Sequence, residues 1–229
     1  LKTLKKDDTQ FYADIWDSIA PFIKIGAMED EKFAEQVENI ILFSTKLDAN
    51  KKDEKDLIIS NDKFYTTINS YLSRLKQDSD KRIIYCTDEI SQKNALNLWT
   101  NQGAEVLMTE AVVDTQFIPW LESRNNELKF VRVDSEINSE LEEDNKELLD
   151  KDGESGSDHL RNIIKDALND EKITIKVQSI EGDNAPPSMI LLPEQMRRIN
   201  DIGALMEQRL PGLPDHHVFV VNKKHVLVE

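Results

Sequence analysis

The apolar positions of this chain repeat with two different periods. In several stretches they recur three and four residues apart, the spacing that places side chains on one face of a helix. The helices predicted from this spacing cover 11–20, 33–41, 61–75, 91–101, 114–121, 158–168 and 194–208. Pro21 is expected to end the first helix, because proline has no N–H to donate within a helix. Asn61 and Asp62 are expected to cap the start of the third.

Short runs rich in β-branched and aromatic residues lie between these helices. The strands predicted from them cover 82–86, 105–108, 128–133, 173–177, 188–192 and 217–221. Up to residue 133 strands alternate with helices, which indicates an α/β fold with a parallel or mostly parallel sheet. In the last part of the chain the order of elements is mixed, which indicates an α+β fold.

One stretch separates these two parts. Residues 134–157 hold ten acidic residues against Lys146 and Lys151, and glycine and serine cluster at the end of the stretch. Such a segment buries too little apolar surface to offset the entropy lost on ordering. We therefore expect a first domain over 1–133, an acidic linker over 134–157 and a second domain over 158–229.

Composition and charge exclude several classes of function. The 229 residues carry 44 acidic and 29 basic side chains, a formal net charge of −15, which repels nucleic acids and anionic membranes. No apolar run is long enough to span a bilayer, and the single cysteine, Cys86, cannot form an intramolecular disulfide. We expect a cytoplasmic protein. Because the chain starts at Leu1 within an amphipathic pattern and stops without a turn signal, we expect a piece of a longer polypeptide.

A search for reactive groups finds little. The chain contains no phosphate-binding glycine motif, no nucleophile elbow and no zinc-protease motif, and it holds only seven glycines. His159, His216, His217 and His225 lack the spacing of a metal site, so we expect no metal or cofactor. Asp88 follows a predicted strand, where a catalytic carboxylate of an α/β enzyme would lie, although Thr87 and Asp88 are also good helix caps. We favour the cap, and keep as the alternative an enzyme that uses Asp88 as phospho-acceptor or base.

Apolar side chains are the stronger candidates for function. The helix over 194–208 carries Met196, Ile199, Ile202 and Met206 along one face, with charged residues on the other. Methionine is flexible and suits varied apolar partners. A second cluster contains Phe117 and Trp120, with Pro119 tolerable only in the first turn of its helix. Either cluster serves as a binding surface or as part of a core, and the sequence leaves both interpretations open.

Several ordered strings resemble a known family. They are FIKIGAMED (22–30), IILFSTK (40–46), SYLSRLKQDSDKRIIYCT (70–87), NQGAEVLMTEAVVD (101–114) and NKKHVLVE (222–229). In this order they resemble the later middle domain and the C-terminal domain of the ninety-kilodalton heat-shock chaperones, and in particular the bacterial members. The resemblance implies a small α/β/α middle subdomain followed by an α+β C-terminal domain without its dimerisation helices.

The resemblance also implies a function. Members of the family are ATP-driven, dimeric chaperones of the cytosol. Their ATP and Mg²⁺ bind in an N-terminal domain that this chain is expected to lack, so no catalytic residues are expected in it. Without the dimerisation helices the chain itself is expected to be a monomer. Its expected partners are partly folded client proteins. The implied client-binding residues are Met196, Ile199, Ile202, Met206, Phe117 and Trp120. The chain departs from the family at Asn200, which replaces an apolar residue, and at Gln116, which replaces an aromatic one.

Overall fold

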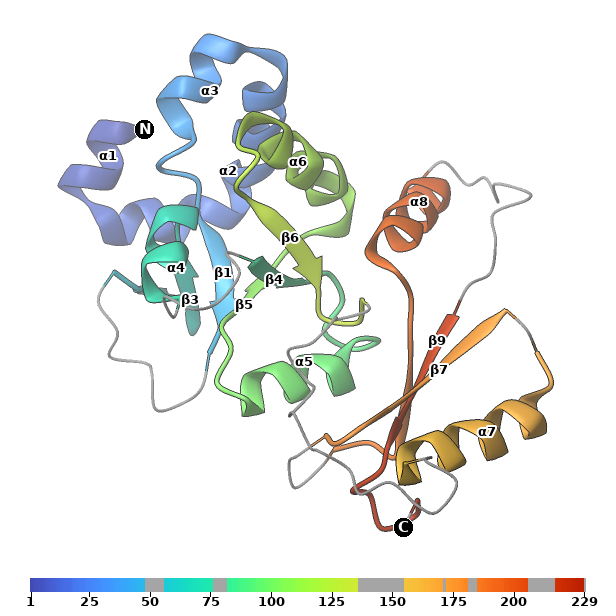
Figure 1. Cartoon of the computed structure of the whole chain (residues 1–229). Coiled ribbons are helices and arrows are strands. Elements are labelled where there is room, and N and C mark those ends of the chain that lie inside the picture. The colour runs from blue at the N-terminus through green and yellow to red at the C-terminus, as the bar shows by residue number, and fades with distance from the viewer. Residues whose placement is uncertain are drawn as a thin grey trace. The chain divides into compact units, whose positions relative to one another are not determined.

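The structure is a computed structural model (Figure 1). It describes residues 1–47, 56–75, 82–135, 155–170, 172–180, 185–205 and 217–228. The chain divides into two compact units, Leu1–Val133 and Asp134–Glu229. Each unit combines helices with its own sheet, and the α/β and α+β class predicted from the sequence is confirmed.

The first unit contains a six-stranded sheet in the order β2-β3-β1-β5-β4-β6. Its strands are β1 (Phe43–Lys46), β2 (Ile58–Ser60), β3 (Lys63–Thr66), β4 (Arg82–Cys86), β5 (Val106–Met108) and β6 (Lys129–Arg132). Its helices are α1 (Lys2–Asp7), α2 (Thr9–Glu29), α3 (Glu31–Val37), α4 (Ile68–Arg74), α5 (Lys93–Asn101) and α6 (Ala111–Arg124). Strands β5, β4 and β6 are parallel, as alternation with helices predicts, whereas β1, β2 and β3 pair antiparallel.

The antiparallel half contains the main error of the sequence prediction. Asn61 and Asp62 do not cap a helix but form the two-residue turn between β2 and β3. Both have positive φ, 49° and 60°, which is the backbone of the hairpin turn that matches strand twist. The following helix starts only at Ile68, where the Thr67 side chain accepts a hydrogen bond from the Ser70 N–H.

Proline does not end either long helix of this unit. Helix α2 continues through Pro21 to Glu29, and α6 contains Pro119 in its second half rather than in its first turn. A proline inside a helix costs one backbone hydrogen bond and strains the preceding turn. Ala20, directly before Pro21, and Ile23, two residues after it, are both buried, so core packing holds the helix together across the proline.

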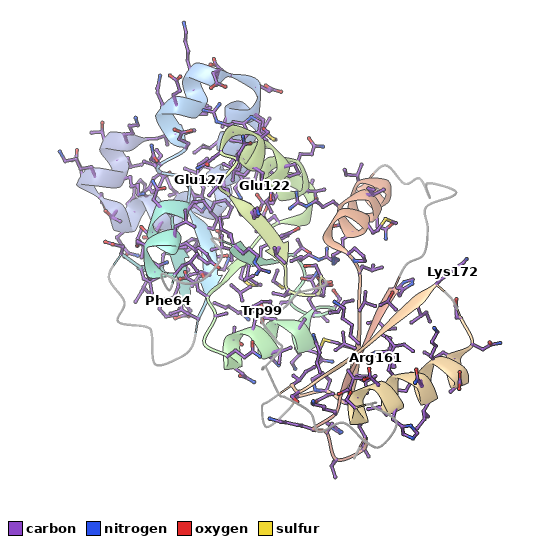
Figure 2. The ribbon with its side chains drawn as sticks, viewed as in Figure 1. Phe64, Trp99, Glu122, Glu127, Arg161 and Lys172 are labelled. Atoms are coloured by element: carbon purple, nitrogen blue, oxygen red, sulfur yellow. The ribbon has the colours of Figure 1, made fainter. Side chains whose placement is uncertain are left out.

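The core of the first unit lies between the sheet and the packed helices α2 and α6. Its largest fully buried side chains are aromatic: Tyr12, Phe43, Tyr65, Tyr71, Phe117 and Phe130. The edge strand β6 is held by side chains from helices. The Glu122 carboxylate of α6 accepts a 2.7 Å hydrogen bond from the Phe130 N–H, and the Trp99 indole donates to the Val133 carbonyl at 3.0 Å (Figure 2).

The second unit contains a three-stranded sheet in the order β7-β9-β8, with β7 and β9 parallel and β8 antiparallel. Its elements are α7 (Gly156–Leu168), β7 (Ile173–Gln178), β8 (Ser188–Leu191), α8 (Glu194–Leu205) and β9 (His217–Asn222). The buried cluster that forms the main core contains no residue of this unit. The second unit has its own buried apolar residues, Ile175, Ile180, Leu191, Val218, Val220 and Val221.

The acidic stretch expected to be a linker begins and ends in the second unit. Asp134 accepts a 2.7 Å hydrogen bond from the Arg197 guanidinium of α8, and Ser135 pairs with Leu192 in a single β-bridge. At the other end, Ser155 caps α7 in a reciprocal capping box with Asp158. Residues 136–154 lie outside the described residues.

Candidate functional site

Helix α8 carries three of the residues predicted to bind clients. Ile202 is 39% exposed, and Met196 and Ile199 are half-buried. Met206, the fourth residue predicted to bind clients from the helix expected over 194–208, lies outside the described residues. Spacing of three residues aligns the described three along one side of the helix. We call Met196, Ile199 and Ile202 the α8 stripe.

A buried ion pair fixes α8 next to this stripe. Arg197 is buried, and its guanidinium holds the Asp134 carboxylate at 2.7 Å. Burial of an arginine requires a charged partner, because an isolated charge loses its hydration. The pair therefore holds the helix in place while the Ile202 end of the stripe stays open.

Phe117 does not belong to an exposed patch, and its prediction as a surface contact is wrong. It is 0% exposed, with its ring 6.4 Å from that of Phe43 and 5.2 Å from that of Trp120. Trp120 is half-buried, stacked on Phe117 at one face and covered by the Arg124 guanidinium 5.0 Å from its ring centroid. Helix α6 packs on α2, so its aromatic side faces the core.

A buried ion pair also holds α6 in place. Lys24 of α2 donates to the Asp114 carboxylate at 2.7 Å, and Asp114 also accepts from the Glu110 N–H at the start of α6. The ammonium lies 4.8 Å from the Phe43 ring centroid and 5.7 Å from that of Phe117. Both charges are almost fully buried, each compensates the other, and the two rings further stabilise the ammonium. The interior around Phe117 is therefore a fixed polar and aromatic cluster.

Asp88 holds a turn. Its carboxylate accepts hydrogen bonds from the Ile90 N–H at 2.9 Å and the Ser91 N–H at 3.4 Å. Hydrogen bonds from the Ser91 side chain and from these backbone groups lower the pKa of Asp88. A general base needs a raised pKa, so this environment favours a structural role. The predicted helix cap is wrong in its position, because Asp88 caps a turn and the N-cap of the following helix, α5, is Gln92.

The other candidate reactive groups are dispersed. Cys86 is fully buried at the end of β4. Within the described residues, histidine, cysteine, aspartate and glutamate form no group of three or more that would hold a metal ion. The same residues include no helix long and apolar enough to cross a membrane.

Two open apolar residues near these helices were missed by the sequence analysis. Val112, in the first turn of α6, and Ile190, in β8 four residues before α8, are both largely exposed. Val112 points away from the side of α6 that carries Phe117, and Ile190 is the exposed position of a continuous apolar run. Periodicity marks such residues as apolar but does not reveal that no neighbour covers them.

Comparisons with known proteins identify the family of this chain. The family model for the Hsp90 protein matches residues 1–229. The chain is 27% identical over 242 residues to the chaperone protein HtpG of Porphyromonas gingivalis. That alignment covers all of this chain and 33% of the relative. It is 24% identical to HtpG of Bacteroides thetaiotaomicron, covering 33% of that protein, and 26% identical to HtpG of Idiomarina loihiensis, covering 34%. All of this chain is covered in both.

The chain thus spans about a third of the length of the curated relatives it matches. Among solved structures, the middle domain of a putative heat shock protein of Plasmodium falciparum aligns with a TM-score of 0.43. That alignment has 19% identity and covers 59% of this chain and 52% of the other. Because the family model matches from the first residue to the last, the chain belongs to the HSP90 family of heat-shock chaperones.

Proposed function

We propose that this chain supplies part of the surface with which an ATP-dependent HSP90 chaperone binds partly folded client proteins. The observation that carries the proposal is the α8 stripe, whose Ile202 stays open to water while Arg197 on the same helix is fixed by Asp134. An open apolar side chain on a fixed helix binds a partner without first unfolding part of the protein.

Binding on this surface needs no reactive group. A client lowers its free energy by burying apolar surface against the stripe, at about 25 cal/mol per Å² before ordering costs. Met196 adapts its shape to different clients, because its side chain is unbranched. The net charge of −15 favours clients whose apolar segments are flanked by basic residues.

The remaining activities belong to the longer protein. In this proposal ATP and Mg²⁺ bind outside this chain, the full-length protein is a cytoplasmic homodimer, and the isolated chain is a monomer that hydrolyses no ATP. The interactions of Asp88 support this role over that of an enzyme that uses Asp88 in catalysis. Light scattering of the isolated chain at micromolar concentration checks the monomer, and a tight dimer would contradict it.

The test replaces the α8 stripe. A variant with Met196→Ser, Ile199→Ser and Ile202→Ser is compared with wild type for binding to a fluorescently labelled, permanently unfolded model protein. Loss of three partly open apolar side chains is expected to raise Kd about 10- to 100-fold, that is, by about 1.4 to 2.7 kcal/mol. The matched control is Ile90→Ser, since Ile90 is 89% exposed on a loop of the first unit.

Two results would contradict the proposal. One is an unchanged Kd for the triple variant. The other is a large fall in the melting temperature of the second unit, which would mean that the stripe is part of its core. Circular dichroism of both variants at the temperature of the binding assay separates these cases.

A further inference from the structure

Helix α2 is apolar on two opposite sides. One side faces the core and is buried through Tyr12, Trp16 and Ile23. The opposite side carries Phe11, Ile15, Phe22 and Ile25, spaced by four, seven and three residues, which keeps all four within one narrow band of the helix surface. We call these four residues the α2 outer stripe. A helix that is apolar all round is normally buried on every side.

The outer stripe is open in this chain. Phe22 is 76% exposed, Phe11 49% and Ile25 43%, and Ile15 is half-buried. Two exposed phenylalanines on one helix are unfavourable in water, so this surface is expected to be covered in the complete protein.

The size of the surface indicates what covers it. If a fully exposed large side chain has about 200 Å² of surface, the exposed fractions of Phe11, Phe22 and Ile25 amount to about 340 Å². A stable interface between two separate proteins needs about 800 Å² on each partner, more than twice this area. Contacts between domains of one chain bury about 300 to 750 Å² on each side, because the covalent connection keeps the local concentration high. The area is therefore too small for a stable dimer of this chain and lies at the lower end of the range for contacts within one polypeptide.

The position of the stripe indicates which part of the polypeptide. Leu1 leads through the short helix α1, which packs on α2, to Phe11 at the start of the stripe. Glu229 belongs to the other unit. A domain joined at Leu1 closes the shorter loop to the stripe, and shorter loops lose less entropy on closing. The relatives are about three times as long as this chain, so a full-length protein has room for such a domain.

We infer that the α2 outer stripe is the docking surface for the domain that precedes Leu1 in the full-length chaperone. A second copy of the chain and an unfolded client are the competing occupants. This inference is independent of the α8 stripe, since the two surfaces lie on different units.

Cysteine labelling tests the inference. Phe22→Cys and Ile25→Cys are made separately in the full-length protein and in the 229-residue chain, with Ile90→Cys as the exposed control. The rate of alkylation is read by mass spectrometry of the peptide that carries the new cysteine. The native Cys86 is fully buried and does not interfere. Near-ultraviolet circular dichroism confirms that each variant is folded.

Labelling at positions 22 and 25 is expected to be at least about tenfold slower in the full-length protein than in the isolated chain. This factor corresponds to a docked state about ten times more populated than the open state, because only the open state is labelled. Labelling at position 90 is expected to be the same in both. Equal rates at position 22 overturn the inference. So does protection in the isolated chain that grows with its concentration, which indicates a second copy. Protection in the full-length protein only when a client is added overturns it as well.

Discussion

Replacing Phe117 by alanine separates a core role from a surface role in α6. The side chain is fully buried between Phe43 and Trp120, with the Lys24 ammonium nearby. Deleting a buried phenylalanine costs about 3 to 5 kcal/mol, because the apolar contacts are lost and a cavity remains. The first unit comprises residues 1–133, and its unfolding entropy is about 0.28 kcal/mol per kelvin. We therefore expect its melting temperature to fall by about 11 to 18 °C.

The assay follows this unit alone. The three tryptophans, Trp16, Trp99 and Trp120, all belong to the first unit, so tryptophan fluorescence during heating reports its unfolding separately from that of the second. The control is Phe117→Leu, which keeps most of the side-chain volume and is expected to cost under about 1.5 kcal/mol.

The outcome for client binding distinguishes the two roles. Well below its melting temperature, the Phe117→Ala variant is expected to bind an unfolded client as wild type does, because the ring is not at the surface. A melting temperature within about 2 °C of wild type, together with weaker client binding, would refute the assignment of Phe117 to the core.

Three further predictions concern stability. Lys24→Met leaves the Asp114 carboxylate buried without its cation, and is expected to lower the free energy of unfolding in urea by about 3 to 5 kcal/mol. The double variant Lys24→Met/Asp114→Asn is expected to recover part of this loss. Equal stability of the single and the double variant would contradict the prediction. Burial raises the pKa of Tyr12 and of Tyr65 above the unfolded value of about 10, so their contribution to stability is complete below pH 10 and is lost as the pH rises above it. Tyrosinate absorbance is expected to appear together with unfolding, and ionisation of all tyrosines in the folded protein would argue against this. Ser155→Ala removes the cap of α7 and is expected to cost about 1 kcal/mol in the second unit, seen by circular dichroism, with no change in tryptophan fluorescence.

Elements with a clear period could be predicted from the sequence. The spacing of apolar residues predicts a helix over 158–168, and α7 covers Gly156–Leu168. The alternating run over 217–221 corresponds to β9, His217–Asn222. In these segments local preference and tertiary packing favour the same structure, so the pattern alone is sufficient.

Other segments depend on contacts that lie far away in the sequence. Phe64 fits a helical spacing with the residues after it, yet it lies in β3. The sequence does not reveal this strand, because four residues are too few to show an alternating period. Pro21 and Pro119 would end isolated helices, but packing between α2 and α6 keeps both helices intact. Local preference is only a weak guide where a helix is buried on one side.

The sequence predicted which residues of the candidate site are apolar, but not which of them are exposed. Periodicity groups Phe117 with Trp120, but it does not show that Lys24, more than ninety positions earlier, supplies the cation that lies against Phe117. Likewise Ile199 and Ile202 share one stripe, and only the structure shows that Ile202 is the more open of the two. A sequence pattern identifies which side chains are apolar, whereas exposure depends on every neighbour in space.

Site-specific photo-crosslinking tests the central claim most directly, because it asks whether the α8 stripe touches a client. A photoreactive phenylalanine derivative is placed at position 202 of the full-length protein and, as a control, at position 90. Position 202 is expected to crosslink to an unfolded model client and not to the same client in its folded state, with at most background crosslinking at position 90. Crosslinks of equal yield at both positions, or none at position 202, would contradict a client-binding role for the α8 stripe.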